Sequence, residues 1–573
     1  MDRHELEAVM IPRRAMLAAG PLALASCGRA EQPYFGRTDP PRTQRFVYVL
    51  GAEPGTLDPP KSDSPWGAPI IHALFDGLTN LDAKTGEPVA ALATHYHMTS
   101  DGLRYTFWLR GHPEPGGIPI SATVRARVPA RWSDGGAITA HDFVYSWRRA
   151  VAPDTAAMYA ALLFEPVVNV RSIASGKEIP EALGVQALDD FSLQVQLEAR
   201  VPFFLRLLAM RQFFATPRQA IEKARLRGSE SSWTDPAHVV TSGPFTLRER
   251  RRYDRILLVK NPDYYGAPEI MLEEILFHTV VDGATSANLY KAGEVSFSMP
   301  MAPQLLAGLR TKKDLHSHPD AGAFFPVMNT RKPPFDDVRV RYAINMATDK
   351  LAIARFLGEG YQPQAGVVPP MAGYVPPASV PVDINGTIFD IASYNPDAAR
   401  VLLAKTGFGG GLSFEYLVPA MPDMRLIAEI LQHQWKLNLG ANMRIVIQDE
   451  PTWVQSVENL DYSGIAMWAE IGGLEDPSWF LDLFKSTTNM GGTGWSDARF
   501  DALLAGAKAV VDPSARMSKL AECESYLLQA MPCLPLCNYV FRYLIKPYVK
   551  GFASPFWGRV FNDAWIDTNW RPQ

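Results

Sequence analysis

The stretch PPFDDVRVRYA, residues 333–343, is the segment of this chain that says most about its fold. A helix is predicted to begin at about Asp337, because apolar residues recur from there at helical spacing. Four of them are expected to face the interior: Val340, Ala343, Ile344 and Ala347. Arg339 and Arg341 fall between these positions and are expected to face outward. The stretch therefore predicts an amphipathic helix packed on a core.

Helices and strands alternate on both sides of this helix. The run FVYVL at 46–50 is a candidate buried strand, and RYTFWLR at 104–110 alternates apolar and polar residues as a half-buried strand does. Thr139 followed by Asp142 has the spacing of a capping box, which predicts the start of another helix. A third helix is predicted near residues 423–437. Alternation of this kind favours a multidomain α/β protein.

The composition describes a large globular chain without a strong electrostatic field of either sign. Its 573 residues predict about three domains. The net charge is −4, which argues against a nucleic-acid-binding role. No segment contains the roughly 18 uninterrupted apolar residues that are typical of a membrane-spanning helix.

Residues 1–27 have the pattern of an export signal rather than of a folded element. Arg13 and Arg14 precede an apolar run over residues 15–26, and its length falls within the range of a signal sequence. The run ends in LASC, which looks like a bacterial lipobox with Cys27 as the residue that carries lipid. We therefore expect a periplasmic or cell-surface protein that is lipid-anchored to the membrane through Cys27. An ordinary signal peptide with a chance cysteine is the alternative.

A search for catalytic chemistry finds no motif that requires it. HExxH, GxSxG and a phosphate-binding P-loop are all absent from the sequence. The run GFGGG at 407–411 follows a helical pattern and is better explained as a helix end and turn. His95 and His97 share one face of a predicted strand, but no third metal ligand lies nearby in the sequence. We therefore expect a binding protein rather than an enzyme, with no metal and no cofactor.

Several strings, in order and over about residues 46–573, resemble the oligopeptide-binding family. These proteins are the extracytoplasmic substrate-binding components of peptide-importing ABC transporters, solute-binding protein family 5. The strings are EPGTLDP at 53–59, FDGL at 75–78, TFWLR at 106–110, WSDG at 132–135 with TAHDFVYSW at 139–147, TSGPF at 241–245, NPDYY at 261–265, and PPFDDVRVRYA at 333–343.

The resemblance implies an α/β, two-lobed periplasmic-binding-protein fold (type II, cluster C) with an extra domain inserted in lobe I. It implies that the lobes close on a bound oligopeptide and that the protein, a monomer, delivers it to an ABC permease. The implied division assigns residues 28–75, 218–321 and 542–573 to domain I, 76–217 to domain II, and 322–541 to domain III.

The resemblance also implies a peptide-binding site in which protein and peptide backbones pair as added strands. The residues that match the positions of this site are Asp63, Pro65, Tyr159, Gly322, Ala323, Phe324, Trp468, Ala469 and Tyr539. Of these, Gly322–Phe324 and Trp468–Ala469 fall on the two ligand-pairing strands, and Tyr539 lies near the hinge.

The largest departure from the family pattern follows Trp468. The family has an aspartate three residues past this tryptophan, which pairs with the α-ammonium of the peptide, whereas this chain has Ile471 in the string WAEIGGLEDP. Glu470 could take the role, because a carboxylate enclosed between lobes favours a cationic partner. Glu475 or Asp476 could also do so after a loop rearrangement, or the ligand has no free amine there.

The positions that bind the peptide C-terminus in the family are not matched either. Arg425 lies one residue from one of them. These departures leave two alternatives to an oligopeptide importer component. One keeps the fold but binds a sugar, an opine, a cell-wall peptide or a metal chelate. The other is a secreted hydrolase or a chaperone-like holder of unfolded chains.

Overall fold

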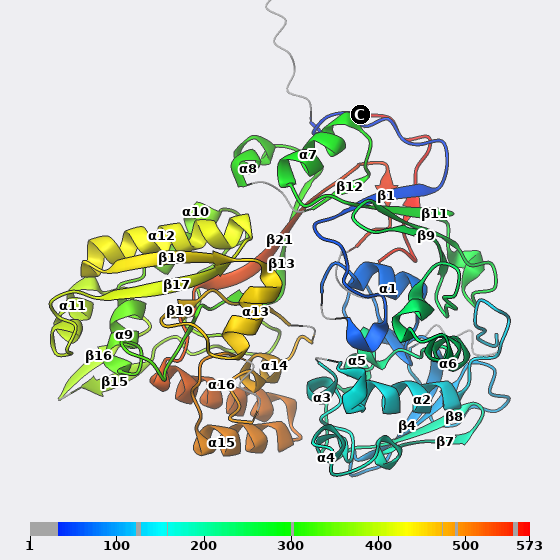
Figure 1. The fold of residues 1–573 in the computed structure, drawn as a ribbon, viewed down its shortest axis with the longest axis horizontal. Coiled ribbons are helices and arrows are strands. Elements are labelled where there is room, and N and C mark those ends of the chain that lie inside the picture. The colour runs from blue at the N-terminus through cyan, green and yellow to red at the C-terminus, as the bar shows by residue number, and fades with distance from the viewer. Residues whose placement is uncertain are drawn as a thin grey trace, which may run out of the picture.

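The computed structural model describes residues 33–62, 64–121, 128–157, 159–299, 303–384, 386–472, 474–487, 491–553 and 560–572. The chain forms two lobes that are joined by two long strands, β13 (Leu315–Phe324) and β21 (Cys537–Ile545) (Figure 1). The lobe on the right in Figure 1 holds the first helices of the chain, and the lobe on the left holds α9 to α16. The structure confirms the predicted α/β class.

The largest sheet in the described part of the chain has eight strands and contains both joining strands. Its order is β20-β13-β21-β12-β1-β11-β10-β9. The strands not yet given are β1 (Arg45–Leu50), β9 (Phe245–Arg251), β10 (Arg255–Lys260), β11 (Glu274–Thr279), β12 (Phe297–Ser298) and β20 (Ala469–Ile471). The predicted strand at 46–50 is confirmed as β1, which lies inside the sheet, parallel to β11 and β12.

The joining strands are antiparallel, and their pairing is interrupted. Residues 315–319 of β13 pair with residues 540–544 of β21, and the register then shifts before Ala323 pairs with Asn538. Such an irregularity bends a strand and increases its twist. The break lies where β13 and β21 pass from one lobe to the other (Figure 1).

The right-hand lobe contains a second, five-stranded sheet in the order β6-β4-β5-β8-β7. Its strands are β4 (Ala93–Met98), β5 (Arg104–Leu109), β6 (Ile118–Pro119), β7 (Val185–Asp189) and β8 (Ser192–Gln196). β5 buries every second residue, as the sequence predicted. The capping box is also confirmed: Thr139 begins helix α2 (Ala140–Val151), and its backbone N–H donates to the Asp142 carboxylate at 2.8 Å.

The remaining elements of this lobe are short. The helices are α1 (Ala68–Leu74), α3 (Ala160–Leu163), α4 (Val170–Ala174), α5 (Phe204–Leu207), α6 (Arg218–Leu226), α7 (Gly283–Ala292) and α8 (Pro303–Leu309). The paired short strands are β2 (Thr79–Leu81) with β3 (Pro88–Ala90), and β22 (Val549–Lys550) with β23 (Trp565–Ile566).

Four of the strings that marked the family resemblance meet in the core of this lobe. The Asp76 carboxylate accepts hydrogen bonds from the hydroxyls of Tyr264 and Tyr265 at 2.9 and 2.7 Å. The backbone N–H of Asp76 donates to Ser242 Oγ at 3.0 Å, and the Arg110 guanidinium lies 3.8 Å from the Tyr265 ring centroid. These strings, which are far apart in the sequence, therefore build one buried polar network in the fold.

The left-hand lobe is built around a four-stranded sheet in the order β14-β19-β17-β18. Its strands are β14 (Val327–Met328), β17 (Ser413–Pro419), β18 (Asn442–Gln448) and β19 (Ile465–Ala466), and a hairpin of β15 (Pro381–Ile384) and β16 (Thr387–Asp390) projects from it. The helices are α9 (Val338–Met346), α10 (Lys350–Leu357), α11 (Pro396–Ala404), α12 (Pro422–Leu439), α13 (Glu450–Glu458), α14 (Pro477–Asp482), α15 (Ala498–Ala509) and α16 (Pro513–Ala530).

The helix predicted from residues 333–343 is confirmed as α9, with Asp337 as its N-cap and its apolar face buried. One detail was wrong: Arg341 faces inward and is only 6% exposed. Its guanidinium donates to the carbonyl of Ala530, the last residue of α16, at 2.8 and 3.0 Å, and to the carbonyl of Phe335 at 2.6 Å. Arginine is tolerated there because helix-end carbonyls, which lack partners in their own helix, satisfy its donors.

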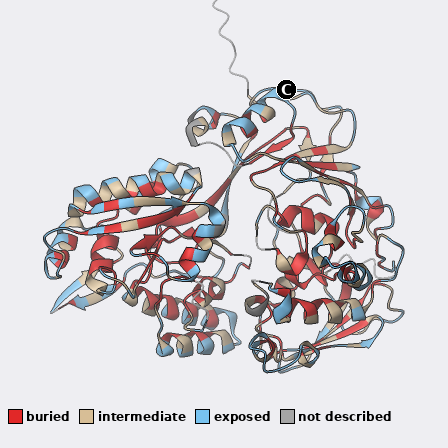
Figure 2. Cartoon of the chain, viewed as in Figure 1, coloured by how far each residue is buried: buried red, intermediate tan, exposed pale blue. Residues whose placement is uncertain are grey.

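The buried side chains form separate cores in the two lobes (Figure 2). One large cluster draws on residues between 46 and 299 and between 541 and 566, and also takes in Leu474. Two further clusters lie within residues 323–537. In the described residues, no helix combines the length and apolar character that crossing a bilayer requires.

Candidate functional site

The two lobes are in contact through side chains that lie far apart in the sequence. Arg206 Nη1, in the right-hand lobe, lies 2.9 Å from Glu475 Oε2 in the left-hand lobe. Lys485 Nζ lies 2.8 Å from Glu165 Oε1. Leu474 belongs to the main core cluster of the right-hand lobe. The lobes therefore meet at these contacts as well as at the joining strands, and the region between the two sets of contacts is the candidate binding site.

β20 forms one edge of the eight-stranded sheet at this site. Gly322 pairs with Ile471, Ala323 with Glu470 and Phe324 with Ala469. β13 lies between β20 and β21, so the backbone of residues 322–324 already faces a strand on each side. β20 has a strand neighbour on one side only among the described elements. A free strand edge presents unpaired N–H and C=O groups, to which an extended peptide can add.

Glu470 lies on this edge strand, between two indole rings. Its Oε1 accepts from Trp479 Nε1 at 2.9 Å, and its Oε2 accepts from Trp468 Nε1 at 3.3 Å. Trp479 also packs against core clusters of both lobes, which places the carboxylate at the inter-lobe region. Burial raises the pKa of Glu470 to about 7, although the two indole N–H groups oppose that rise.

The structure separates the three acidic residues that the sequence left as alternatives. Asp476 is bound to Arg516 through two hydrogen bonds of 2.7 and 2.9 Å, and it also caps α14. Glu475 is paired with Arg206. Among the described residues no basic side chain forms an ion pair with Glu470. It is therefore the candidate whose charge is still available to a ligand cation.

Gly322 allows three strands to approach closely beside Glu470. A Cβ atom at this position would lie 2.8 Å from Tyr539 Cβ and 2.9 Å from the Glu470 carbonyl oxygen. Tyr539 stacks on Phe324 with a centroid distance of 5.0 Å. Its ring contacts the cores of both lobes, as expected of a residue near the hinge. The predicted residues Gly322, Ala323, Phe324, Ala469, Glu470 and Tyr539 are thus brought together.

The predicted residues of the right-hand lobe that the structure describes, Pro65 and Tyr159, lie outside its helices and strands. Pro65 is exposed, and the loop before it is held by Ser62, whose carbonyl accepts from Gln212 Nε2 at 2.9 Å. Tyr159 is half-buried at the start of α3 and packs on the core of its lobe. The helix that follows Tyr159 leads to Glu165, which forms the inter-lobe ion pair. Asp63 and Cys27 lie outside the described residues.

Arg425 is placed differently from the other predicted residues. Its side chain is 60% exposed on α12, where Nε lies 2.8 Å from Glu429 Oε1 one turn further along the same helix. The ion pair recorded for it is thus local to α12 and does not join Arg425 to the residues around Glu470.

The indole partner of Glu470 was not found by sequence reasoning. Trp479 lies nine residues further along the chain, in α14, and no spacing rule connects it to a strand residue. Trp453, in α13, is a second such residue, because its ring lies 5.5 Å from that of Trp468. Only the folded chain shows that Trp468 and Trp479 hold the glutamate and that Trp453 packs on Trp468. Among the described residues no group of histidine, cysteine or acidic side chains is arranged to hold a metal ion.

Comparison with known proteins gives consistent matches over most of the chain. The family model "Bacterial extracellular solute-binding proteins, family 5 Middle" matches residues 123–492. The murein peptide-binding protein MppA of Escherichia coli is 29% identical over 89% of this chain and 90% of its own length. The probable deoxycholate-binding protein YgiS of Escherichia coli is 31% identical, with coverage of 89% and 90%.

Solved structures match the whole architecture. The murein tripeptide-binding protein MppA of Escherichia coli gives a TM-score of 0.79 at 27% identity, covering 92% of this chain and 99% of its own. Haemophilus influenzae OppA in complex with RPPGFSPFR also gives a TM-score of 0.79. It is 25% identical, and the match covers 92% of this chain and 100% of its own. The unliganded open form of MppA gives a TM-score of only 0.67 at 27% identity, covering 92% of this chain and 98% of its own. The lobes of this chain are therefore arranged less like the open form than like the other two structures.

Proposed function

Because the chain belongs to the bacterial extracellular solute-binding proteins of family 5, we propose that it captures oligopeptides outside the cytoplasmic membrane and delivers them to an ABC permease. Proteins of this family bind and transfer a solute rather than transform it. The observation that carries the peptide assignment is Glu470, a carboxylate at a free strand edge whose recorded partners are two indole N–H groups.

The proposed binding mode places the peptide along β20 as an added strand. Backbone hydrogen bonds would supply affinity without reading the peptide sequence. The α-ammonium of the peptide would lie at Glu470, where a charge-assisted hydrogen bond in an enclosed site is stronger than one in water. Trp468, Trp479 and Trp453 would line this end of the site, because an aromatic face also attracts a cation.

We propose that the other predicted residues contribute from both lobes. Asp63, Pro65 and Tyr159 would contact the ligand from the first lobe, and Gly322–Phe324, Trp468, Ala469 and Tyr539 would form the strand platform. Arg425 would bind the peptide C-terminus. The support for this role is that Arg425 lies, in the sequence, one residue from a position that has it in the family.

The division of the chain that we propose follows the same lines. Domain I comprises residues 28–75, 218–321 and 542–573, domain II residues 76–217, and domain III residues 322–541. Support for the limits of domain III comes from the core clusters, which fall on either side of them with the exception of Leu474 and Phe541. The register shift between Pro319 and Ala323, at the boundary between domains I and III, supports a hinge there.

We further propose that residues 1–27 are a lipoprotein signal that ends at the lipobox cysteine, and that the mature protein is a monomer which begins at Cys27 and is held at the membrane by a lipid on it. The lipobox-like LASC string supports this proposal. A lipid anchor would keep the protein beside its permease and raise the local concentration of the pair. Metabolic labelling with a fatty-acid analogue tests the anchor, and Cys27→Ser should abolish the label.

A non-peptide solute is the second candidate for the ligand. YgiS, a relative at 31% identity, is named as a probable deoxycholate-binding protein, which supports a non-peptide ligand as the alternative. The surroundings of Glu470 favour a cationic group, which disfavours an anionic solute at that point. Identification of the natural ligand, combined with the Glu470→Gln variant, separates the two candidates.

The test combines identification of the natural ligand with a charge deletion. Native mass spectrometry of the protein purified from cells should release a mixture of peptides on denaturation. Glu470→Gln, which keeps the size of the side chain, should weaken a free-amine peptide about 10- to 100-fold by titration calorimetry, and should leave the N-acetylated peptide unchanged. Glu522→Gln, an exposed glutamate of α16, is the matched control. A single non-peptide mass, or equal losses for both peptides, would overturn the proposal.

A further inference from the structure

A pocket in the left-hand lobe, separate from the inter-lobe region, contains a buried lysine. The cavity has a volume of about 270 Å³ and lies at the start of α10. Lys350, the first residue of that helix, is only 8% exposed. The other lining residues are Thr348, Asp349, Leu351, Pro363, Gln364, Ala365, Ala392 and Tyr394.

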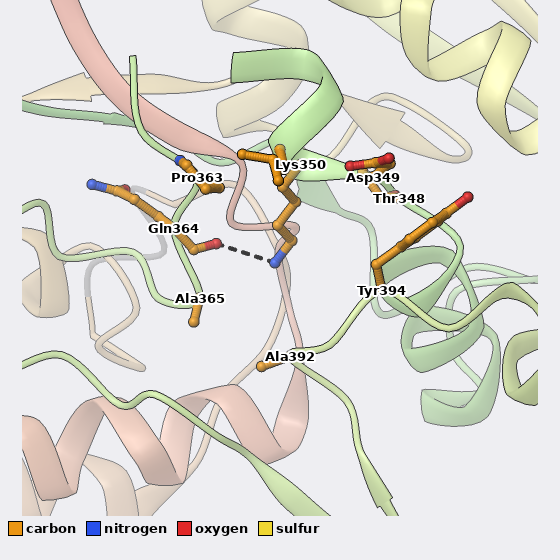
Figure 3. Close-up of a pocket in the computed structure, with 9 residues that line it drawn as sticks. Thr348, Asp349, Lys350, Pro363, Gln364, Ala365, Ala392 and Tyr394 are labelled. Atoms are coloured by element: carbon orange, nitrogen blue, oxygen red, sulfur yellow. Dashed lines mark hydrogen bonds between the residues drawn. The ribbon is translucent and has the colours of Figure 1, made fainter. Parts of the chain in front are cut away.

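The ammonium group of Lys350 points into this pocket. Figure 3 shows Nζ in the space between Gln364, Ala365 and Ala392, with its single drawn hydrogen bond to the Gln364 carbonyl oxygen. That bond is 3.2 Å long. An ammonium has three N–H donors, so two are not accounted for by this bond. Among the described residues no acidic side chain forms an ion pair with Lys350.

The acidic groups near the pocket are engaged elsewhere. The Asp349 carboxylate caps α10 by accepting from the Ala352 N–H at 2.8 Å. The Asp390 carboxylate accepts from the N–H groups of Val380 and Ala392 at 2.9 and 3.2 Å. Burial lowers the pKa of Lys350 to about 8, although Cys533 and Asp390 oppose that change. At neutral pH the group is still mainly cationic.

The size and walls of the pocket define what could neutralise this charge. A volume of about 270 Å³ corresponds to roughly nine waters at the ~30 Å³ that each occupies in the liquid. Pro363, Ala365 and Ala392 supply mainly apolar walls, and Lys350 is the one cation among the lining residues. We infer that this pocket is a second ligand site, in which Lys350 binds the carboxylate of a short-chain monocarboxylic acid.

The location of the pocket gives it a structural link to the hinge. The N–H of Gln364 donates to the carbonyl of Leu536 at 2.9 Å, and Pro363 forms a bridge with Cys537, the first residue of β21. One wall of the pocket is therefore fixed to the strand that joins the two lobes. A bound carboxylate would contact the segment that positions the start of this strand.

Sodium butyrate, titrated into the full chain at constant ionic strength and pH 7, tests the inference. In protein labelled with ¹³C at the lysine ε-carbons, one resonance should shift and saturate with a dissociation constant on the order of 1 mM. Lys350→Met should remove that resonance and the heat of butyrate binding measured by calorimetry. Lys436→Met, an exposed lysine of the same lobe, should change neither.

A second variant guards against misfolding of the lysine mutant. Ala392→Leu fills the pocket but keeps Lys350, so it should abolish butyrate binding while Glu470→Gln leaves it intact. Equal responses to sodium chloride and sodium butyrate, retained binding in Lys350→Met, or no saturable shift in the wild-type protein would each overturn the inference.

Discussion

At the scale of single residues, the environment of Glu470 decides the chemistry of the site. The carboxylate is held by two indole N–H groups and has a pKa of about 7. A bound α-ammonium favours the charged carboxylate, so the pKa of Glu470 should fall when a peptide binds. In the proposed binding mode, affinity would therefore depend on a group that is half protonated near neutral pH.

Affinity for a free-amine peptide should decrease as the pH falls below about 7, because the carboxyl must then lose a proton before it can bind. The affinity should fall by up to about tenfold for each unit by which the pH is lowered. This decrease should end when the pH reaches the pKa that Glu470 has in the complex. Above pH 8 the α-amine, whose ordinary pKa is about 7.7–8.0, loses its charge and affinity should fall again. Calorimetric titrations between pH 5 and pH 9 measure this profile. An N-acetylated peptide should show no such maximum, and a flat profile for the free-amine peptide would contradict the assigned role.

Arg341 gives a second prediction at the residue scale, which concerns stability. Arg341→Met should lower the free energy of unfolding by about 2–4 kcal/mol, because it leaves the buried carbonyls of Ala530 and Phe335 without their donor. Urea denaturation followed by circular dichroism measures this. Arg339→Met is the control: Arg339 forms a part-exposed ion pair with Asp337, so its removal should cost much less stability than Arg341→Met.

At the scale of the elements, β13, β20 and β21 depend on the missing side chain of Gly322. Gly322→Ala should separate β20 from β13, because the new Cβ would meet backbone and Cβ atoms at less than 3.0 Å. We expect a loss of stability of about 1–3 kcal/mol and a clear loss of peptide affinity. Gly506→Ala, in α15 where a Cβ meets nothing within 4 Å, should instead be neutral or slightly stabilising. Unchanged peptide affinity in Gly322→Ala would show that the β20 edge is not the binding strand.

At the scale of the whole molecule, the ion pairs between the lobes hold them together. Lys485 pairs with Glu165, and Arg206 pairs with Glu475. Burial tends to raise the pKa of Glu165, but its cationic neighbours Lys485, Lys508 and Arg171 outweigh this and hold that pKa at about 2. The carboxylate of this pair is therefore charged throughout the physiological range.

Lys485→Met should accelerate ligand release about two- to fivefold, since a partly exposed ion pair contributes up to about 1 kcal/mol to the closed form. Stopped-flow release of a fluorescent peptide measures the rate, and raising the salt concentration should reduce the difference between wild type and variant. Lys519→Met, which removes a pair within α16, should leave the rate unchanged. An unaltered rate in Lys485→Met would show that this contact does not stabilise the closed form.

Much of the fold was accessible from local sequence patterns. The strands at 46–50 and 104–110, the capping box at Thr139 and the helix after Asp337 all follow from periodicity and end signals that act within a few residues. The family resemblance supplied the two-lobed fold. Arg341 was misplaced because its charge predicts exposure, whereas one of the two carbonyls that satisfy it, that of Ala530, lies 189 residues away at the end of α16.

The site was only partly accessible, for the same physical reason. The sequence by itself determined that the chain is exported in character, α/β, a member of this family, and altered after Trp468, because these properties reside in composition and local strings. It left Glu470, Glu475 and Asp476 equivalent as acidic residues. Only the tertiary structure decided between them: it placed Arg206 beside Glu475, Arg516 beside Asp476, and two indole N–H groups beside Glu470. The charge state and availability of a carboxylate depend on such neighbours in space, and these are brought together by folding rather than by order along the chain.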